Sequence, residues 1–240
     1  MNNNFIGGIH SLLDGIHIII QPGIKRYVAI PIIINLILFL SLFLFTRHWM
    51  SDFNLWLTQL LPGWLQWLNT VIWVLFTISF FIIFIYTFVT LANLIAAPFN
   101  SLLAERVEFY LTGTALPSTG FLAQLKDVPR ILGRQLSIIA YYIPRALLIL
   151  ILFFIPIIHV LATPIWFLFN AWLMAFTYLD YPTDNHRIPL SDVKIWMKQN
   201  RWSCFGFGIM VLFLSMIPIL NLIVMPAAVA GGVKLWVETK

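Results

Sequence analysis

The feature that most constrains this chain is an uncharged stretch from Tyr27 to Thr46, composed mostly of Ile, Leu and Phe. As a helix, its 20 residues would extend about 30 Å, which is the thickness of a bilayer core. A longer stretch, from Phe53 to Ala104, is also uncharged. Charged residues make up only 10% of the chain, against about 25% in soluble domains. We therefore expect an all-α integral membrane protein.

Prolines and charges set the expected limits of two long transmembrane helices. The first span is predicted over 24–47, because Pro22 and Gly23 precede it and the charged Arg47 ends it. The second is predicted over 66–97, between Pro62 and Pro98. That span is longer than a bilayer requires, so we expect it to tilt or to extend beyond the membrane, to about residue 112.

Two later apolar segments differ from these spans, because each contains two prolines that are eight residues apart. The segments are 146–179 with Pro156 and Pro164, and 202–233 with Pro218 and Pro226. The apolar arms before the prolines are short for a full crossing. We predict two similar, partly inserted helical hairpins, over 135–180 and 200–237. The alternative is four ordinary kinked spans.

Residues 5–20 have apolar side chains at helical spacing, which predicts an amphipathic helix that lies in the membrane interface. His10, Asp14 and His17 share one face of it. They could bind a metal ion, but the polar face of an interfacial helix is the better explanation, so no metal site is assigned. With the spans and hairpins, this helix completes a single membrane domain over 1–240.

Two adjacent cations, Lys25 and Arg26, follow the Pro22-Gly23 turn at the start of the first span. Free backbone N–H groups at a helix N-terminus and neighbouring cations together favour an anion. The same residues also fit a topology signal, because Lys and Arg are enriched in cytoplasmic loops. The net charge of +5 suits anionic lipid or an anionic solute. No nucleic-acid motif accompanies it, so no nucleic-acid partner is expected.

Catalytic motifs are missing from the sequence. It lacks the phosphate-binding G-x-x-x-x-G-K-[ST] loop, H-E-x-x-H and G-x-S-x-G. We expect no cofactor and no enzyme activity. The main alternative is a membrane-embedded hydrolase that uses Asp180, Asp184 and His186, although such polar runs more often cap helices or form turns. A non-transporting membrane scaffold is a further alternative.

Four residues are candidates for lining or gating a transport path. Glu105, Arg106 and Glu108 are the first charges after the long uncharged stretch, where an ion would leave the membrane. Glu105 and Glu108 are three apart and share a helix face, from which Arg106 points away. The alternative for these three is a solvated helix face beyond the bilayer. His159, at the tip of the first hairpin, is the fourth candidate.

The ordered set of segments resembles the bacterial CysZ sulfate permease family from about Gly15 to Val237. The matching strings are QPGIKRYVAIPIIIN, TLANLIAAPFNSLLAERVE, KDVPRILGRQ, YYIPRALLILILFFIP, WFLFNAWLMAFTYLDYPTDNHRIP and MIPILNLIVMPAAV. The resemblance implies channel-like sulfate uptake across the bacterial inner membrane for cysteine biosynthesis. It also implies a multi-pass helical fold, with two true spans and two partly inserted hairpins, assembled as a homo-oligomer, a dimer or larger.

The family's Gly-Leu-Arg anion motif matches Gly23-Ile24-Lys25 here, followed by Arg26. The resemblance therefore implies a sulfate site at these four residues. Lys in place of Arg replaces a planar fork with a point charge, so either Lys25 or Arg26 is the main contact. The sequence also leaves open whether transport is passive or proton-coupled, and whether other oxyanions are excluded.

Overall fold

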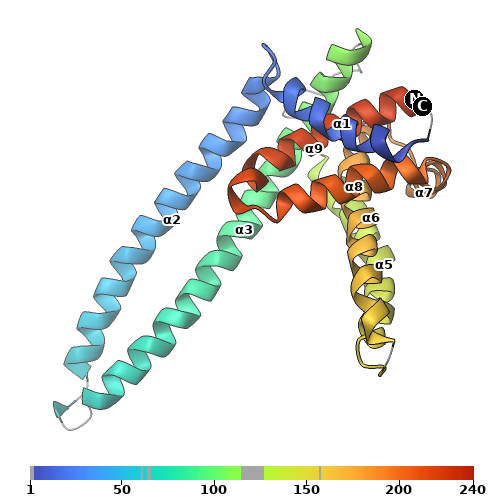
Figure 1. Cartoon of the computed structure of the whole chain (residues 1–240). Coiled ribbons are helices and arrows are strands. Elements are labelled where there is room, and N and C mark those ends of the chain that lie inside the picture. The colour runs from blue at the N-terminus through green and yellow to red at the C-terminus, as the bar shows by residue number, and fades with distance from the viewer. Residues whose placement is uncertain (1–2, 61, 64–65, 115–126, 157) are drawn as a thin grey trace. The chain divides into compact units, whose positions relative to one another are not determined.

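The computed structural model describes residues 3–60, 62–63, 66–114, 127–156 and 158–240, and these ranges contain helices and no strand. The helices are α1 Phe5–Ile19, α2 Lys25–Leu60, α3 Gln66–Thr112, α5 Val128–Leu152, α6 His159–Asn185, α7 Leu190–Gln199, α8 Arg201–Ser215 and α9 Pro218–Thr239 (Figure 1). The predicted all-α class is confirmed. The chain forms two compact units, residues 1–28 with 98–240, and residues 29–97.

Four helical segments of the described chain are long and apolar enough to cross a membrane. They are Lys25–Leu60, Thr70–Phe88, Pro129–Leu152 and His159–Asn185. These segments confirm a multi-pass membrane protein. By contrast, α8 has 15 residues and is about 22 Å long, which is less than the ~30 Å of a bilayer core.

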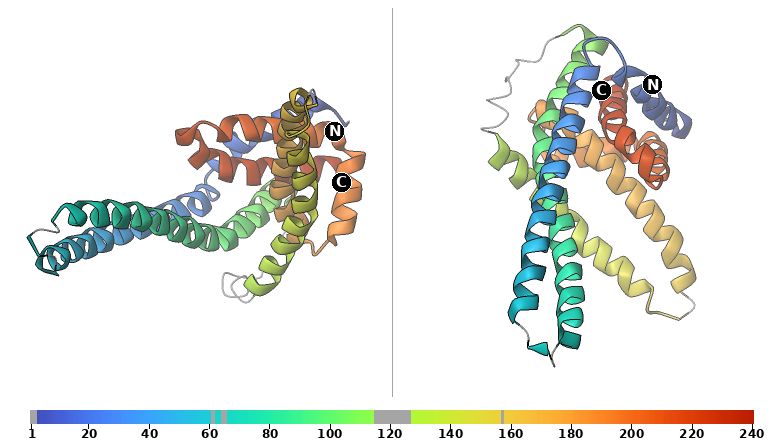
Figure 2. Two further views of the ribbon diagram at one scale, coloured as in Figure 1. Left: turned by 90° about the horizontal axis from the view of Figure 1, so that it is seen from below. Right: turned by 90° about the vertical axis from the view of Figure 1, so that its left-hand side faces the viewer.

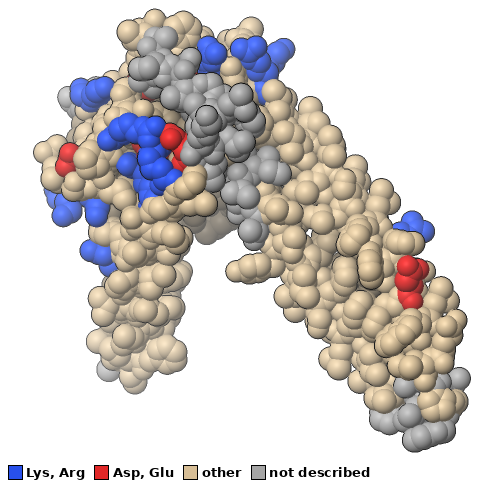
Figure 3. Space-filling model, turned by 180° about the vertical axis from the view of Figure 1, so that it is seen from behind, with Lys and Arg blue, Asp and Glu red and all other residues tan. Residues whose placement is uncertain are grey.

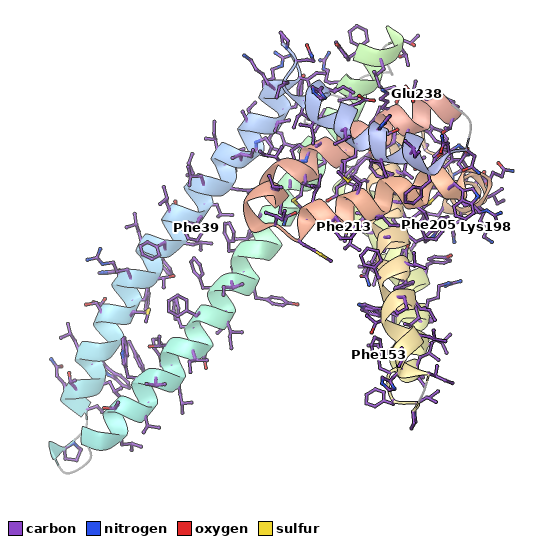
Figure 4. All side chains as sticks on the ribbon, viewed as in Figure 1. Phe39, Phe153, Lys198, Phe205, Phe213 and Glu238 are labelled. Carbon is purple, nitrogen blue, oxygen red and sulfur yellow. The ribbon has the colours of Figure 1, made fainter. Side chains whose placement is uncertain are left out.

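The unit of residues 29–97 is an antiparallel hairpin, in which α2 and α3 run side by side (Figures 1 and 2). Aromatic side chains hold the two helices together. Phe39 points toward α3 (Figure 4), and its ring centroid lies 5.9 Å from that of Phe84. Nearer the connection, Phe53 stacks on Phe76 at 3.8 Å. The other faces expose large apolar side chains, as lipid-facing helices do.

The other unit combines α1, α5 to α9, the start of α2 and the end of α3 around a common core. Its largest fully buried side chains include Leu12, Phe176, Leu179, Met197, Phe207 and Val233. Helix α1 packs against α8 and α9. This packing is close because a Cβ atom on Gly15 would lie 2.2 Å from the Ala227 carbonyl oxygen, and one on Gly8 would lie 1.9 Å from that of Ser203. One face of α1 therefore packs closely against the core.

Only the first proline of each pair lies at a turn. Helix α5 ends at Leu152 and α6 begins at His159, so Pro156 lies between them, whereas Pro164 lies inside α6. Similarly, α9 begins at Pro218 and continues through Pro226. Prolines within membrane helices are tolerated when neighbouring groups satisfy the freed backbone carbonyls. Residue 157 of the first turn lies outside the described residues.

Candidate functional site

The turn before α2 leaves backbone donors free. The Ile24 and Lys25 N–H groups both donate to the Gln21 carbonyl, at 3.1 and 3.2 Å. The N–H groups of Gly23 and Arg26 have no acceptor among the residues that the structure describes. Gly23 has φ of +89°, a backbone conformation that glycine adopts without strain. The Ile24 side chain is buried in the core, and this packing holds the turn in place.

Tyr27 brings a third cation to the turn. Its hydroxyl accepts a hydrogen bond from Arg106 Nε at 2.9 Å and another from Arg26 Nη2 at 3.3 Å. Both guanidinium groups also lie over the tyrosine ring, at 5.7 and 5.0 Å from its centroid. Among the described carboxylates, none forms an ion pair with Lys25, Arg26 or Arg106. This part of the surface therefore carries three cations that have no ion-pair partner among the described residues.

Glu105 and Glu108 are only 9% and 7% exposed, whereas Arg106 between them in sequence is exposed. Burial raises the pKa of the Glu105 carboxyl, while the positive charge of Arg106 partly opposes this shift. Glu108 is paired with His186, whose Nε2 lies 2.7 Å from Oε1 of the carboxylate. A solvated helix face therefore describes Arg106 but not the two acids.

The start of α5 and the end of α6 are joined by two arginine–aspartate pairs. Arg134 Nε donates to both oxygens of Asp180, at 2.9 and 3.1 Å. Arg130 Nη2 donates to Asp184 at 3.0 Å. The Arg134–Asp180 pair is the more buried, with side-chain exposures of 11% and 5%, and Arg134 also donates to the Ile188 carbonyl at 2.7 Å. This cluster, called here the Arg–Asp network, fixes the polar end of α6.

Neighbouring polar groups extend the network to α3. Ser101 Oγ donates to Asn185 at 2.6 Å, and Asn185 donates back to the Ser101 carbonyl at 3.0 Å. Asn100 Nδ2 donates to the Tyr181 hydroxyl at 3.2 Å. The hydrolase alternative has no support in this geometry, because both aspartates are neutralised by arginines and His186 contacts Glu108 instead. The polar run after Leu179 therefore connects helices.

The remaining candidates lie apart from these clusters. His159 is the exposed first residue of α6, 21 residues before Asp180, which places it about 32 Å along the helix from the network. On α1, Asp14 forms an ion pair with Lys234 of α9. Burial by itself would lower the pKa of the Lys234 ammonium, but the contacts with Asp14 and Glu238 together outweigh it and raise the pKa. This ion pair gives Asp14 a structural role in joining α1 to α9.

Tyr27, Arg130 and Arg134 are the residues that sequence reasoning missed. The arginines are four residues apart on α5, and the aspartates that they contact are four apart on α6. The sequence signal for this contact was therefore the same i, i+4 spacing of two positive charges in one polar helix end and of two negative charges in another. No sequence signal identified Tyr27 as part of the site, because a tyrosine at the end of a span also fits an interfacial anchor.

Comparison with known proteins gives consistent matches over most of the chain. The family profile described as "Sulfate transporter CysZ/Etoposide-induced protein 2.4" matches residues 11–226. The chain is 44% identical over 237 residues to a sulfate transporter CysZ of Pectobacterium atrosepticum, covering 96% of this chain and 84% of the relative. It is 38% identical over 239 residues to a sulfate transporter CysZ of Pseudomonas fluorescens, covering 98% and 94%.

Proposed function

Because the chain belongs to the sulfate transporter CysZ/etoposide-induced protein 2.4 family, we propose that it carries sulfate across the bacterial inner membrane as a channel-like permease. The sulfate would supply cysteine biosynthesis. The observation that carries the proposal for this chain is a group of cations that form no ion pair with any described carboxylate, beside free N–H donors at the start of α2. A transporter of an anion requires such a site and needs no catalytic group.

The proposed sulfate site consists of Gly23, Ile24, Lys25 and Arg26, with Arg106 as a fifth contributor. Sulfate is a dianion that only accepts hydrogen bonds at neutral pH, so its site needs donors and cations and no carboxylate. The free Gly23 and Arg26 N–H groups supply neutral donors. The guanidinium groups supply forked, charged donors. Tyr27 would hold both of them in position for the anion.

The proposed transport direction has an energetic requirement. At a potential of ~100 mV, negative inside, moving two negative charges inward costs about 4.6 kcal/mol. Passive uptake is therefore feasible when assimilation keeps cytosolic sulfate very low, and a coupled proton is the alternative. The spans Lys25–Leu60 and Thr70–Phe88 contain one acid, Asp52, and it pairs with His48 at 3.5 Å.

Radiolabelled sulfate flux into liposomes that contain only the purified chain tests this function. We expect saturable uptake that follows the sulfate gradient. Protein-free liposomes provide the blank, and chloride uptake reports unselective leakage. Uptake no faster than in the blank would favour a non-transporting scaffold.

We also propose that the pairs α5–α6 and α8–α9 enter the membrane from one side and return to it, with both chain termini cytoplasmic. Arg145 supports this for the first pair, because it is exposed on α5 and only seven helical residues follow it. A full crossing would place that guanidinium in lipid, at a cost of about 3 kcal/mol. The short α8 supports it for the second pair. The exposed face of α1, with Ile6, Leu13 and Ile20, would then lie in the interface.

Labelling of a single cysteine at the tip of α5–α6 distinguishes a hairpin from two full spans. Phe154 is 86% exposed just after the end of α5, and the neighbouring Phe153 marks this tip in Figure 4. In a Cys204→Ala background, we expect Phe154→Cys to stay unlabelled when a membrane-impermeant maleimide is added to spheroplasts, in which the inner membrane is intact and accessible from outside. Gly63→Cys, in the α2–α3 connection, should react. Equal labelling at the two positions would show that α5 and α6 cross the membrane.

One chain has too few full spans to enclose a water-filled path, so the proposed functional unit is a homo-oligomer of at least two copies. Lipid would cover the remaining apolar faces. Native mass measurement in mild detergent checks the stoichiometry. A monomer that transports sulfate at the wild-type rate is incompatible with this proposal.

For the path beyond the site, we propose that Glu105 and Arg106 border the exit. Glu108 would support them through His186, and His159 remains a separate candidate at the α5–α6 tip. Because the Glu105 pKa is raised, its carboxyl takes up a proton at a higher pH than an ordinary glutamate. Protonation removes a negative charge that repels sulfate.

Sulfate flux, measured at equal pH on both sides of the liposome, should therefore rise as the pH falls through the pKa of Glu105. Glu105→Gln should remove most of this rise and give the higher flux at neutral pH. Asp192→Asn, which neutralises an exposed acid on α7, is the matched control and should keep the wild-type profile. If Glu105→Gln keeps that profile as well, Glu105 does not border the path.

A further inference from the structure

A cavity of about 290 Å³ lies within the α2–α3 hairpin and includes none of the residues proposed to bind sulfate. Its lining residues are Phe43, Thr46, Arg47, Met50, Phe81 and Phe84. All six belong to the unit of residues 29–97. Apart from one hydroxyl and one guanidinium, the lining side chains are aromatic or aliphatic. Such a cavity suits a molecule that has a long apolar part and a polar end.

The polar and apolar ends of the cavity are ordered along the hairpin. Arg47 is the first charge after the uncharged stretch that ends at Thr46, so it lies where α2 leaves the bilayer core. Phe43 is one turn, about 6 Å, deeper in the membrane. Helix α3 runs antiparallel to α2, so Phe84 lies deeper than Phe81. The cavity therefore runs from a cation at the boundary to aromatic rings in the core.

Arg47 forms no ion pair with any carboxylate in the part of the hairpin that the structure describes. Arg47 and Asp52 are the only Lys, Arg, Asp or Glu residues from 29 to 97, and Figure 3 shows the nearly uncharged surface of this hairpin. The Asp52 carboxylate pairs with His48 at 3.5 Å. Within the described ranges, no carboxylate pairs with Arg47. A lone cation at a membrane boundary attracts an anionic head group.

A second polar group on the same face also lacks a partner. Thr77 precedes Phe81 and Phe84 by four and seven residues, so all three share one face of α3. Its Oγ1 atom is buried and forms no hydrogen bond with the described residues. A buried hydroxyl without a hydrogen-bond partner is costly, so a polar atom of a ligand would stabilise it. Thr77 lies toward the connection, at the same end of the hairpin as Arg47.

We propose that this cavity binds one anionic phospholipid from the leaflet next to the α2–α3 connection. An acyl chain occupies the apolar end against Phe43 and Phe84, and the phosphate rests on Arg47. The Arg47 side chain can extend toward the connection, so a head-group oxygen of the same lipid can accept a hydrogen bond from the Thr77 hydroxyl after a side-chain rotation. The lipid fills a gap that the two helices leave between them and ties the hairpin to one leaflet. This proposal requires the membrane location of the hairpin and does not depend on sulfate transport.

Native mass spectrometry of the full chain in mild detergent tests the site with two probes that have identical acyl chains, phosphatidylglycerol and phosphatidylcholine. Wild-type protein should retain one phosphatidylglycerol per chain more strongly than phosphatidylcholine. Arg47→Gln should lower phosphatidylglycerol retention about fivefold, the effect of one cation near a membrane surface. It should leave phosphatidylcholine unchanged. Met50→Trp narrows the cavity and should lower the retention of both lipids.

Two variants on the same helix control for general effects. His48→Gln introduces a glutamine at the adjacent position, which does not line the cavity. Leu44→Trp adds the same bulk at an exposed position outside the lining. Both should bind lipid as the wild type does. Equal retention of the two lipids by the wild type, or equal losses in Arg47→Gln and His48→Gln, would overturn the proposal in favour of an unspecific lipid belt. If Met50→Trp does not fold, the lipid retention of Arg47→Gln compared with that of His48→Gln still tests the proposal.

Discussion

Replacing both Lys25 and Arg26 with alanine is expected to weaken sulfate binding on the order of 100-fold, because each charged hydrogen bond to the anion contributes about 1.5–3 kcal/mol. Lys25 and Arg26 are both exposed and unpaired with any described carboxylate, so their loss leaves no buried charge and the protein should still fold and insert. Sulfate titration of the purified protein by calorimetry measures the effect. The two single variants identify the main contact.

Arg106→Ala extends this test to the residue that only the folded chain brings to the turn. Its loss should weaken binding about tenfold, by one charged hydrogen bond, and should affect sulfate more than a monoanion such as nitrate. Lys198→Ala with Arg201→Ala removes two exposed cations at the α7–α8 corner and is the matched control. Sulfate affinity that is equal in the control and in the Lys25/Arg26 variant would remove this turn from consideration as the anion site.

Arg134→Ala is expected to cause the largest loss of stability, about 3–5 kcal/mol, because it leaves the buried Asp180 carboxylate without its partner. For a chain of this size, the loss corresponds to a fall of on the order of 10 °C in Tm. Thermal unfolding in detergent, followed by circular dichroism, measures it. The double variant Arg134→Met with Asp180→Leu should recover most of the loss, since it removes both charges together.

Arg145→Ala provides the comparison for that experiment. Arg145 lies on the same helix but is exposed, and its guanidinium stacks over Tyr141 at 3.7 Å from the ring centroid. Such an exposed cation–π contact contributes about 0.5–1 kcal/mol. A Tm that falls equally in Arg134→Ala and Arg145→Ala would mean that the Arg–Asp network does not hold α5 and α6 together.

The sequence by itself determined the membrane character of the chain and its all-helical class. Transfer of apolar side chains into hydrocarbon depends on local composition and length, which can be read directly from a stretch such as Tyr27–Thr46. The residues of the turn before α2 were also identifiable. The anion site proposed there rests on the start of a single helix, whose free N–H groups do not depend on distant contacts.

Tertiary structure alone decided which distant residues complete these local features. The contact between Arg106 and Tyr27 joins positions 79 residues apart, and no helical periodicity encodes such a pairing. The same holds for Arg134 with Asp180 and for the close approach of Gly15 to Ala227. In each case the sequence specifies a charge or a small side chain. The partner follows only from how the helices pack, because packing brings together side chains whose separation along the chain carries no signal.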